Sequence, residues 1–400
     1  MELSQGRQKV FGFILNDYRA VVWLYGVMVI IATAQQYFPE PMLRDNQIVL
    51  HYNNYVIFKQ SFFHLLEGKD LYMPYGEEHY DVFKYSPTFP ILFSPLAVLP
   101  DFLGLLLWNT LNAALLLIAI RMIPLSTGQS KVKVLLFIFP ALITSIQNSQ
   151  SNALMAALII LSFNFFENDK LFLAAMCLAL GFYIKVFTIV GASLFILYPY
   201  KLRFLLYLLL WLVVLFALPL LILSKEQLLW QYQSWLTTIN NDYSSLYEYS
   251  IMAWLKTWFG IIWPKALIIA GGVLVFCMPI LKLRGLVDQH FRLLLLCSIL
   301  IWVVIFNFNA ESPTFVIAMS GVGLWFFTQK STVVNSMLVI LAFVFGSMST
   351  MDFFPHWLLE NWVEPYVLKV AFSIFIWFKI IMDQMRYRWR LSQTGLGVVI

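Results

Sequence analysis

The chain has 400 residues, of which 61% are hydrophobic and only 12% are charged. A soluble domain is about half apolar and a quarter charged. This composition therefore excludes a sizeable soluble domain and predicts an all-helical polytopic membrane protein, a single integral domain over residues 1–400. The net charge of +5 fits loop lysines and arginines that set membrane topology, and it does not indicate a nucleic-acid partner.

Twelve apolar segments are candidate membrane spans, since a helix needs about 20 apolar residues to cross the hydrocarbon. They cover residues 20–38, 101–123, 132–148, 151–167, 171–184, 186–199, 204–223, 264–282, 292–308, 313–328, 333–349 and 367–382. The first is too long for the apolar core of a cleavable signal, so we expect it to remain as a helix. The fifth and sixth are short and flank Lys185, which predicts a broken or re-entrant pair. Segment 87–100, bracketed by prolines, suits a helix at the membrane surface or leading into the second span.

The basic residues predict the topology. Short cytoplasmic loops are rich in lysine and arginine, and most of the 26 basic residues fall in short loops on one side if the N-terminus is cytoplasmic. We therefore expect both termini, including the tail 383–400, to be cytoplasmic. The loops on that side contain no Gly-rich or Walker-type phosphate loop, which argues against a cytosolic enzyme that uses ATP or a nucleotide sugar. The other face collects the polar segments 38–84, 148–152, 224–263, 307–312 and 350–366, together with the break at Lys185.

The outer loop 39–87 contains an amphipathic pattern. From Asn53 onward, Tyr55, Phe58, Phe62 and Leu65 recur at helical spacing. Gly68 is a suitable helix stop. The sequence thus predicts a helix that lies in the plane of the membrane interface between the first two spans.

Several short motifs follow one another along the outer face. In the first loop, Asn54, Phe58, Gly68 and Tyr72 are followed by YSP at Tyr85–Pro87 and PLAVLP at Pro95–Pro100. Further on come QNSQSNALMAAL at Gln147–Leu158, FYIKVFTIV at Phe182–Val190 and ESPT at Glu311–Thr314. In order and spacing these motifs resemble the GT-C glycosyltransferases, and within them glycosyltransferase family 87, the polyprenol-phosphate-sugar-dependent mannosyltransferases. The resemblance extends from about Gln35 to Phe327.

The resemblance implies a fold and an activity. We expect a GT-C-like bundle of about twelve spans that works on the extracytoplasmic face, in a bacterial inner membrane. The expected reaction moves a hexose or pentose from a polyprenyl-phosphate sugar to a lipid or glycan acceptor, with inversion. The lipid-linked sugar is the donor substrate, and no separate cofactor or metal is expected.

The sequence departs from the family at its catalytic base. The family's first-loop acid is Asn54 here, and an amide cannot serve as a proton acceptor. The family's histidine shortly after the Ser-Pro turn is also missing. Either another carboxylate takes over, with Asp81, Asp45 and Glu311 as candidates, or the chain is not a transferase.

Lys185 is the candidate ligand of the donor phosphate. Ionisable residues within apolar segments are functional candidates because their insertion is costly, and the family motif implies the same role. Lys84 and Tyr85 are possible helpers from the first loop. The alternative is a lysine that marks a turn and reaches water.

Sugar and acceptor ligands are expected from two outer segments. Gln150 and Asn152 match the family's Gly-Gln-x-Asn turn, with Ser149 in the glycine place. Asn240, Asp242 and Ser250 lie in a segment rich in tryptophan, tyrosine and asparagine, which suits carbohydrate binding and equally an aromatic belt at the interface.

Other functions have less support. The five histidines do not show the spacing of a zinc site, and the three cysteines lie far apart inside apolar runs. A transporter or flippase would place charges near the midplane in paired halves, whereas Lys185 has no carboxylate partner in another span. A non-catalytic glycolipid-binding relative is the alternative that Asn54 favours.

Overall fold

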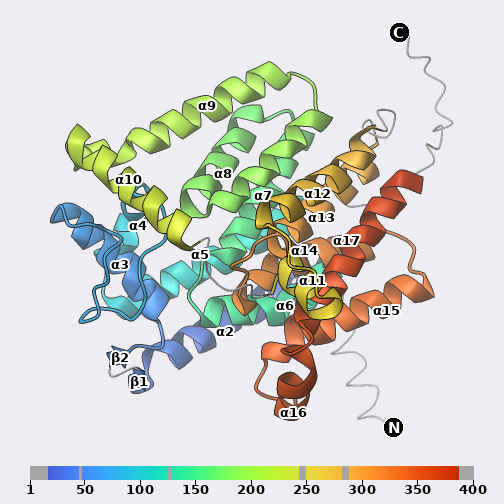
Figure 1. Ribbon diagram of the computed structural model, residues 1–400, viewed down its shortest axis with the longest axis horizontal. Coiled ribbons are helices and arrows are strands. Elements are labelled where there is room, and N and C mark those ends of the chain that lie inside the picture. The colour runs from blue at the N-terminus through green and yellow to red at the C-terminus, as the bar shows by residue number, and fades with distance from the viewer. Residues whose placement is uncertain (1–16, 45–46, 125–127, 243–248, 282–287, 387–400) are drawn as a thin grey trace.

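The structure is a computed structural model that describes residues 17–44, 47–124, 128–242, 249–281 and 288–386 (Figure 1). Its architecture is all-α, as predicted, apart from one short hairpin of β1 (Met42–Arg44) and β2 (Gln47–Val49). The first half contains α2 (Tyr18–Tyr37), α3 (Asn53–Leu66), α4 (Phe89–Ala97), α5 (Asp101–Met122), α6 (Gly128–Gln147), α7 (Asn152–Glu167), α8 (Leu171–Ile184) and the 3₁₀ helix η1 (Val186–Leu197). The second half contains α9 (Lys201–Ala217), η2 (Leu218–Leu221), α10 (Lys225–Asp242), α11 (Ile251–Phe259), α12 (Lys265–Cys277), η3 (Met278–Leu281), α13 (Gln289–Ile305), η5 (Ser312–Thr314), α14 (Phe315–Phe327), α15 (Val333–Ala342), η6 (Phe343–Ser347), η7 (Met348–Thr350), α16 (His356–Leu358), η8 (Leu359–Val363) and α17 (Leu368–Arg386).

Each of the twelve predicted spans coincides with a helical segment. Five helices among the described residues are long and apolar enough to cross a bilayer, and a sixth is obtained if the pair His356–Val363 and Leu368–Arg386, bent by 61°, counts as one span. Six other apolar helices are shorter, at 10–17 residues. The structure therefore supports an integral membrane protein, while the number of spans stays a prediction.

Helix α7 lies at the centre of the bundle. It packs against α5 and α8 and also contacts α13 and α14. All of its residues are buried except Phe165 and Glu167, which are partly exposed. A helix that is apolar all round is expected in such a central position, and its first residue, Asn152, is consequently held at one end of the bundle.

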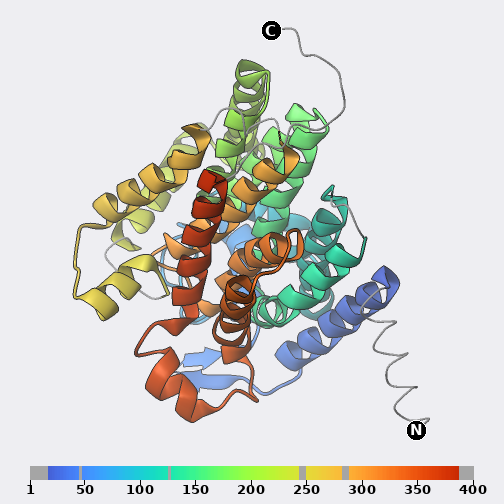
Figure 2. The same ribbon diagram turned by 90° about the vertical axis from the view of Figure 1, so that its right-hand side faces the viewer.

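The helices at the periphery of the bundle expose apolar side chains. Helix α9 lies along the upper edge of Figure 1, and Leu206 and Leu209 on it are each 58% exposed. In Figure 2, α2 (blue) and α12 (gold) lie on opposite sides of the molecule. Continuous exposed apolar surface of this kind is unusual for a soluble protein and suits contact with lipid.

The loop 39–87 contains the predicted helix and an element that was not predicted. Helix α3 begins at Asn53, and the chain turns at Gly68, whose φ of +68° favours glycine. Its apolar stripe packs on protein: the ring of Phe58 lies 5.6 Å from that of Phe93 in α4 and 5.8 Å from that of Trp108 in α5. The helix is confirmed, and its position in the membrane interface stays a prediction. The three-residue strands β1 and β2, paired with Met42 opposite Val49, are too short to leave an alternating pattern in the sequence.

The apolar segment between Pro87 and Pro100 contains α4, as predicted. Together with α3, α10 and the hairpin, it forms the group of elements at the left of Figure 1. This group covers the end of the bundle at which Asn152 lies.

Candidate functional site

The chain breaks at Lys185, as predicted. Helix α8 ends at Ile184, Lys185 is extended with φ −139° and ψ 115°, and η1 packs back against α8. A Cβ atom on Gly181 would lie 2.2 Å from Thr188 Cγ2, so the close return of η1 depends on glycine here. The break places the Lys185 ammonium group beside the first residue of α7, where Nζ donates a hydrogen bond of 2.7 Å to Asn152 Oδ1.

The turn before α7 is held tightly from two sides. Ser149 has a φ of +51° and is fully buried. Its hydroxyl donates to Gln36 Oε1 at 2.8 Å, and its carbonyl accepts a bond of 2.8 Å from Trp108 Nε1. Left-handed backbone conformation favours glycine, which accounts physically for the glycine that the family places at this position.

Hydrogen bonds join four of the predicted site residues into a continuous line, which we call the polar row. Lys185 donates to Asn152, Asn152 Nδ2 donates to Gln150 Oε1 at 2.6 Å, and Gln150 Nε2 donates to Glu311 Oε2 at 2.7 Å. The row begins at a cation, passes through two neutral amides and ends at a carboxylate. Residues from three separate parts of the chain are thus brought together at one end of α7.

The first outer loop adds Tyr85 and Lys84 to this end of the bundle. The Lys185 ammonium group lies 5.9 Å from the centre of the Tyr85 ring, and the Tyr85 hydroxyl lies 3.4 Å from Ser151 Oγ. Burial raises the pKa of the Tyr85 phenol, the hydrogen bond with Ser151 lowers it, and the nearby Glu311 carboxylate raises it. Tyr85 therefore lies beside Lys185, close enough to Glu311 for the carboxylate charge to act on its phenol.

Helix α10 holds the loop segment that leads to these residues. Gln231 Nε2 donates to the Lys69 carbonyl at 2.6 Å, and Ser234 Oγ donates to the Asp70 carboxylate at 2.9 Å. Trp235 Nε1 donates to the Lys84 carbonyl at 3.2 Å. Three successive contacts therefore fix the loop against α10 before it reaches Tyr85.

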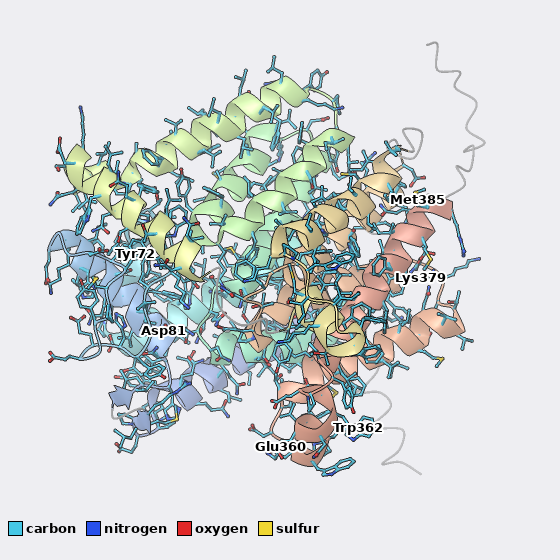
Figure 3. All side chains as sticks on the ribbon, in the orientation of Figure 1. Tyr72, Asp81, Glu360, Trp362, Lys379 and Met385 are labelled. Carbon is cyan, nitrogen blue, oxygen red and sulfur yellow. The ribbon has the colours of Figure 1, made fainter. Side chains whose placement is uncertain are left out.

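The structure separates the candidate bases. The Asp81 carboxylate is 55% exposed and lies 4.0 Å from Lys84 Nζ. In Figure 3, Asp81 lies on the same side of the molecule as Tyr72, and Lys379 of α17 lies on the other side. Asp45 lies outside the described residues. Of Asp81 and Glu311, only Glu311 is hydrogen-bonded into the polar row.

Asn54 has a structural contact with the same turn. Its Nδ2 donates a hydrogen bond of 2.9 Å to the carbonyl oxygen of Asn148. A carboxylate at this position would have no proton to donate. Asn54 therefore makes a bond to this turn that an ionised carboxylate could not make.

The three acceptor-side candidates lie in different surroundings. Asn240 is exposed on α10, and Asp242, the last residue of α10, has a side chain outside the described part of the structure. Ser250 is buried at the start of α11, where its hydroxyl accepts a bond of 3.3 Å from the backbone of Ala253. The backbone bond of 3.2 Å from Tyr249 to Ala310 brings Ser250 near the segment that carries Glu311.

Lys369, at the start of α17, is a polar residue that the sequence predictions omit. It is only 2% exposed, and its Nζ donates to Ser312 Oγ at 2.7 Å. The rings of Tyr249 and Phe315 lie 5.3 Å and 5.4 Å from it. The rule that singles out Lys185, a charge within an apolar segment, applies equally to Lys369.

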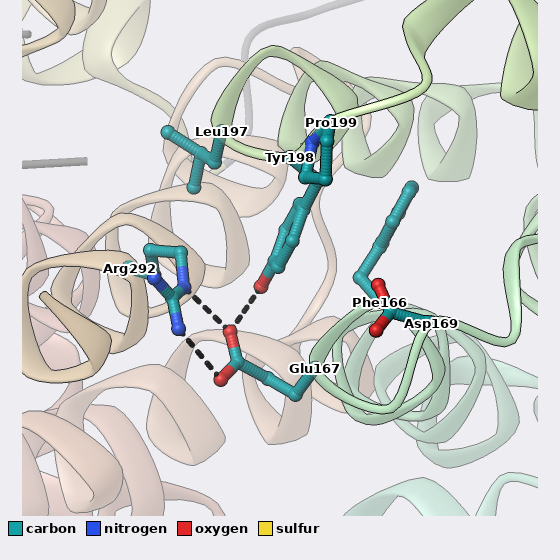
Figure 4. A pocket seen from close by; sticks show the side chains of 7 residues that line it. All are labelled: Phe166, Glu167, Asp169, Leu197, Tyr198, Pro199 and Arg292. Atoms are coloured by element: carbon teal, nitrogen blue, oxygen red, sulfur yellow. Dashed lines mark hydrogen bonds and ion pairs between the residues drawn. The ribbon is translucent and has the colours of Figure 1, made fainter. Parts of the chain in front are cut away.

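A pocket lies at the opposite end of α7 (Figure 4). Its volume is about 340 Å³, and it is lined by Phe166, Glu167, Asp169, Leu197, Tyr198, Pro199 and Arg292. Arg292 contacts both oxygens of Glu167, at 2.6 Å and 2.9 Å. Fifteen residues of helix separate Glu167 from Asn152, a distance of about 22 Å at 1.5 Å per residue, so this pocket is separate from the polar row.

Metal ligands do not gather in the part of the chain that the structure describes: no three histidine, cysteine, aspartate or glutamate side chains come together there. The residues of the polar row include one carboxylate and no histidine. They offer hydrogen bonds and charge for binding and proton transfer.

Comparison with known proteins gives one family match. The family model of Glycosyltransferase family 87 matches residues 83–306, more than half of the chain. No curated protein matches. Among solved structures the chain is similar to ArnT from Cupriavidus metallidurans bound to undecaprenyl phosphate, with 14% sequence identity, a TM-score of 0.39, and coverage of 91% of this chain and 76% of that chain.

Proposed function

Because the chain belongs to glycosyltransferase family 87, we propose that it transfers a hexose or pentose from a polyprenyl-phosphate sugar to a lipid or glycan acceptor, with inversion. The observation that carries this proposal is the polar row, which joins the cation Lys185 to the carboxylate Glu311 through Asn152 and Gln150. Such a reaction needs positive charge at the departing phosphate. It also needs a carboxylate beside the acceptor hydroxyl. The two ends of the row supply these two requirements.

Lys185 is the proposed ligand of the donor phosphate. Its ammonium group has three N–H donors, and one of them is directed to Asn152. The ring of Tyr85 lies beside it, and Lys84 is the next residue along the loop. As the bond between the anomeric carbon and the phosphate oxygen breaks, Lys185 would stabilise the developing negative charge, with Lys84 and Tyr85 in support.

Glu311 is the proposed base. The acceptor hydroxyl would give its proton to the Glu311 carboxylate while its oxygen forms the new bond to the anomeric carbon. Gln150 and Asn152 would orient the sugar or the carboxylate. Asp81 and Asp45 are the alternative bases, and Asn54 would act indirectly, through its bond to the turn at Asn148.

The membrane arrangement is part of the proposal. It has twelve spans, cytoplasmic termini with a tail at 383–400, and α3 in the interface of a bacterial inner membrane. The polar row lies where the charge pattern predicts the extracytoplasmic face. Asn240, Asp242 and Ser250 would contribute to the acceptor side, and neither a cofactor nor a metal takes part.

Donor binding by the purified protein tests this function. We expect thermal stabilisation by one of polyprenyl-phosphate mannose, glucose or arabinose and none by nucleotide sugars; ligand at 100 times its Kd stabilises by about 2.7 kcal/mol. Lys185→Met should abolish the effect. Lys170→Met is the matched control, because Lys170 and Lys185 flank the two ends of α8. Stabilisation by a nucleotide sugar, or donor binding unchanged in Lys185→Met, would contradict the proposal.

A second candidate function is a glycolipid-binding protein without transferase activity. The observation in its favour is Asn54, whose amide makes a structural bond where the family has its acid. Such a protein would bind the donor through Lys185 but form no product with any acceptor extract. Sugar transfer that depends on Glu311 would exclude it.

A further inference from the structure

A buried lysine lies near the Ser-Pro turn, and the polar row does not include it. Lys369 is the second residue of α17, and α17 packs against α11 and α14 (Figure 1). Its ammonium group contacts Ser312 Oγ at 2.7 Å and faces the rings of Tyr249 and Phe315. Within the described ranges no carboxylate lies within 4.0 Å of it.

These contacts do not replace the hydration that the Lys369 ammonium group loses on burial. An ammonium group taken out of water loses strong hydration, and it is normally paired with an anion and fully hydrogen-bonded. Two ring faces recover part of that loss. The single hydrogen bond to Ser312 accounts for one of three N–H donors. Lys369 thus has the surroundings of a cation whose anion is a ligand.

Backbone strain occurs next to this lysine. Val367, two residues before Lys369, has a φ of +52°. For a β-branched residue this is a genuine outlier, and such strain concentrates at functional sites. It sets the direction in which α17 starts and thereby the direction of the Lys369 side chain toward Ser312.

Two further hydroxyl groups in these elements lack partners. Ser373 lies one turn after Lys369 on α17, and Ser347 ends the π-helix η6, which packs on α17. Both are buried, and their Oγ atoms have no hydrogen-bond partner in the described part of the chain. Residues four apart share one face of a helix, so Ser373 lies on the face of α17 that carries Lys369.

Hydrogen bonds connect the Glu311–Ser312 pair to both lysines. Its side chain is connected to Lys185 through the polar row, and Ser312, the next residue, accepts the bond from Lys369. In a transfer reaction the base lies beside the acceptor hydroxyl from which it takes the proton. If Lys185 binds the donor phosphate, Lys369 lies on the acceptor side.

We propose that Lys369 and Ser312 bind a phosphate group carried by the acceptor. A phosphate offers several strong acceptor oxygens, which matches an ammonium group with serine hydroxyls on neighbouring elements. The assignment to the acceptor rests on the proposed function; the existence of the anion site does not. The aromatic rings of Tyr249 and Phe315 flank the ammonium group and exclude water from it.

The test uses the full chain in phosphatidylcholine nanodiscs, with dodecyl phosphate as the probe. In the Lys185→Met background, which removes the proposed donor site, dodecyl phosphate should still stabilise the protein. Adding Lys369→Met should weaken that binding at least tenfold, whereas Lys379→Met, ten residues further along α17, should not change it. Unchanged binding in the Lys369→Met variant would overturn the proposal.

Two controls separate the alternatives. A structural lysine would lower the melting temperature when replaced by methionine, whereas removal of an unpaired buried charge should leave it equal or higher in the absence of ligand. Lys369→Ala gives a second measure if methionine does not fit. Inorganic phosphate is tested in parallel. If it stabilises the protein at the same concentration as dodecyl phosphate, the assignment to a phosphate carried by the acceptor is overturned.

The same variants distinguish this inference from the proposed function. Lys369→Met should leave the Kd for the polyprenyl-phosphate sugar within about threefold of wild type, since Lys185 binds the donor. If the donor binds and the binding of dodecyl phosphate does not depend on Lys369, only the assignment of the anion site is wrong. If no donor binds and the binding of dodecyl phosphate still depends on Lys369, the assignment of the anion site is correct and that of the donor site is wrong.

Discussion

The amides of Asn152 and Gln150 are oriented in the same sense along the polar row. Each accepts a hydrogen bond on the side of Lys185 and donates one on the side of Glu311. Aligned hydrogen bonds polarise one another. The row therefore couples the position of the ammonium group to that of the carboxylate. In the proposed reaction, donor binding at one end would orient the base at the other.

Glu311→Gln tests the proposed base directly. Glutamine keeps the size and one carbonyl oxygen for Gln150, but it cannot accept the acceptor proton. We expect kcat to fall by about 10²–10⁴-fold, with the donor Kd almost unchanged. The measurement is sugar transfer from the donor identified in the binding assay to an acceptor extract.

Asp81→Asn is the matched comparison for this variant. The Asp81 carboxylate is 55% exposed, lies 4.0 Å from Lys84 Nζ and accepts a hydrogen bond of 2.7 Å from the backbone of Val82. It makes no contact with the polar row, so its replacement should change kcat less than threefold. The opposite pattern, in which Asp81→Asn abolishes transfer and Glu311→Gln does not, would assign the base to the first loop.

The sequence predicts which individual residues belong to the candidate site better than it predicts the contacts between them. Lys185, Gln150, Asn152 and Glu311 are recognisable from charge, motif and position, but nothing in the sequence shows that hydrogen bonds link them. Lys369 escapes prediction for a related reason. A lysine near the end of a span usually extends to water, and only the packing of the elements around it shows that this one is buried.

At the scale of the elements, the sequence predicts where helices lie better than it predicts which helices pack against one another. The start of α3 at Asn53 and the break at Lys185 are both visible in the apolar spacing. The 3₁₀ form of η1 is not, because its apolar residues fit either kind of helix. Nor could the spacing show that α3 packs on α4 and α5, since an apolar stripe suits lipid and protein equally.

The first outer loop contains a buried histidine pair that makes its stability depend on pH. His64 Nε2 lies 2.9 Å from Glu78 Oε2, and His79 Nδ1 donates to the Asp81 carbonyl at 2.6 Å. Burial lowers the pKa of His64, although Glu78 and Glu67 act to raise it and Lys69 to lower it. Burial likewise lowers the pKa of His79. The hydrogen bond to the Asp81 carbonyl and the charges of Glu78 and Asp81 oppose this shift by raising the pKa.

These shifts predict a loss of stability in mild acid. A lowered pKa in the folded state means that the unfolded chain binds more protons once the pH falls below about 6.5, the usual histidine value. The contribution is complete above pH 6.5 and is lost as the pH falls toward the pKa values of the folded state. The melting temperature should therefore decrease from pH 7.5 to 5.5, and His64→Gln/His79→Gln should decrease less.

The surface histidine His356 provides the control for this measurement. It is exposed, so His356→Gln should keep the pH dependence of the wild type. An equal dependence in the double variant and the wild type would show that other groups are responsible.

At the scale of the whole molecule, the central helix α7 separates two polar ends. One end carries the polar row, and the other carries the ion pair of Glu167 and Arg292, in which the Tyr198 hydroxyl also donates to Glu167 at 2.5 Å. The length and apolar character of α7 could be read from the sequence. The pairing of Glu167 with Arg292 could not, because 125 residues separate them.

Glu167→Gln should destabilise the bundle without affecting the donor site. The side chains of Glu167 and Arg292 are only 4% and 17% exposed, and removing one partner of a buried pair costs about 3–5 kcal/mol because the other charge is left unpaired. The melting temperature should fall clearly, whereas Asp169→Asn, in the same pocket but at an exposed position, should change it little.

The double variant Glu167→Met/Arg292→Met shows whether the loss arises from an unpaired charge. Replacing both partners by apolar residues of similar size is often neutral, so it should recover most of the stability lost in Glu167→Gln. At a separation of about 22 Å along α7, the effects of these changes and of donor binding should be additive. A donor Kd that rises in parallel with the loss of stability would instead mean that α7 transmits changes from one polar end to the other.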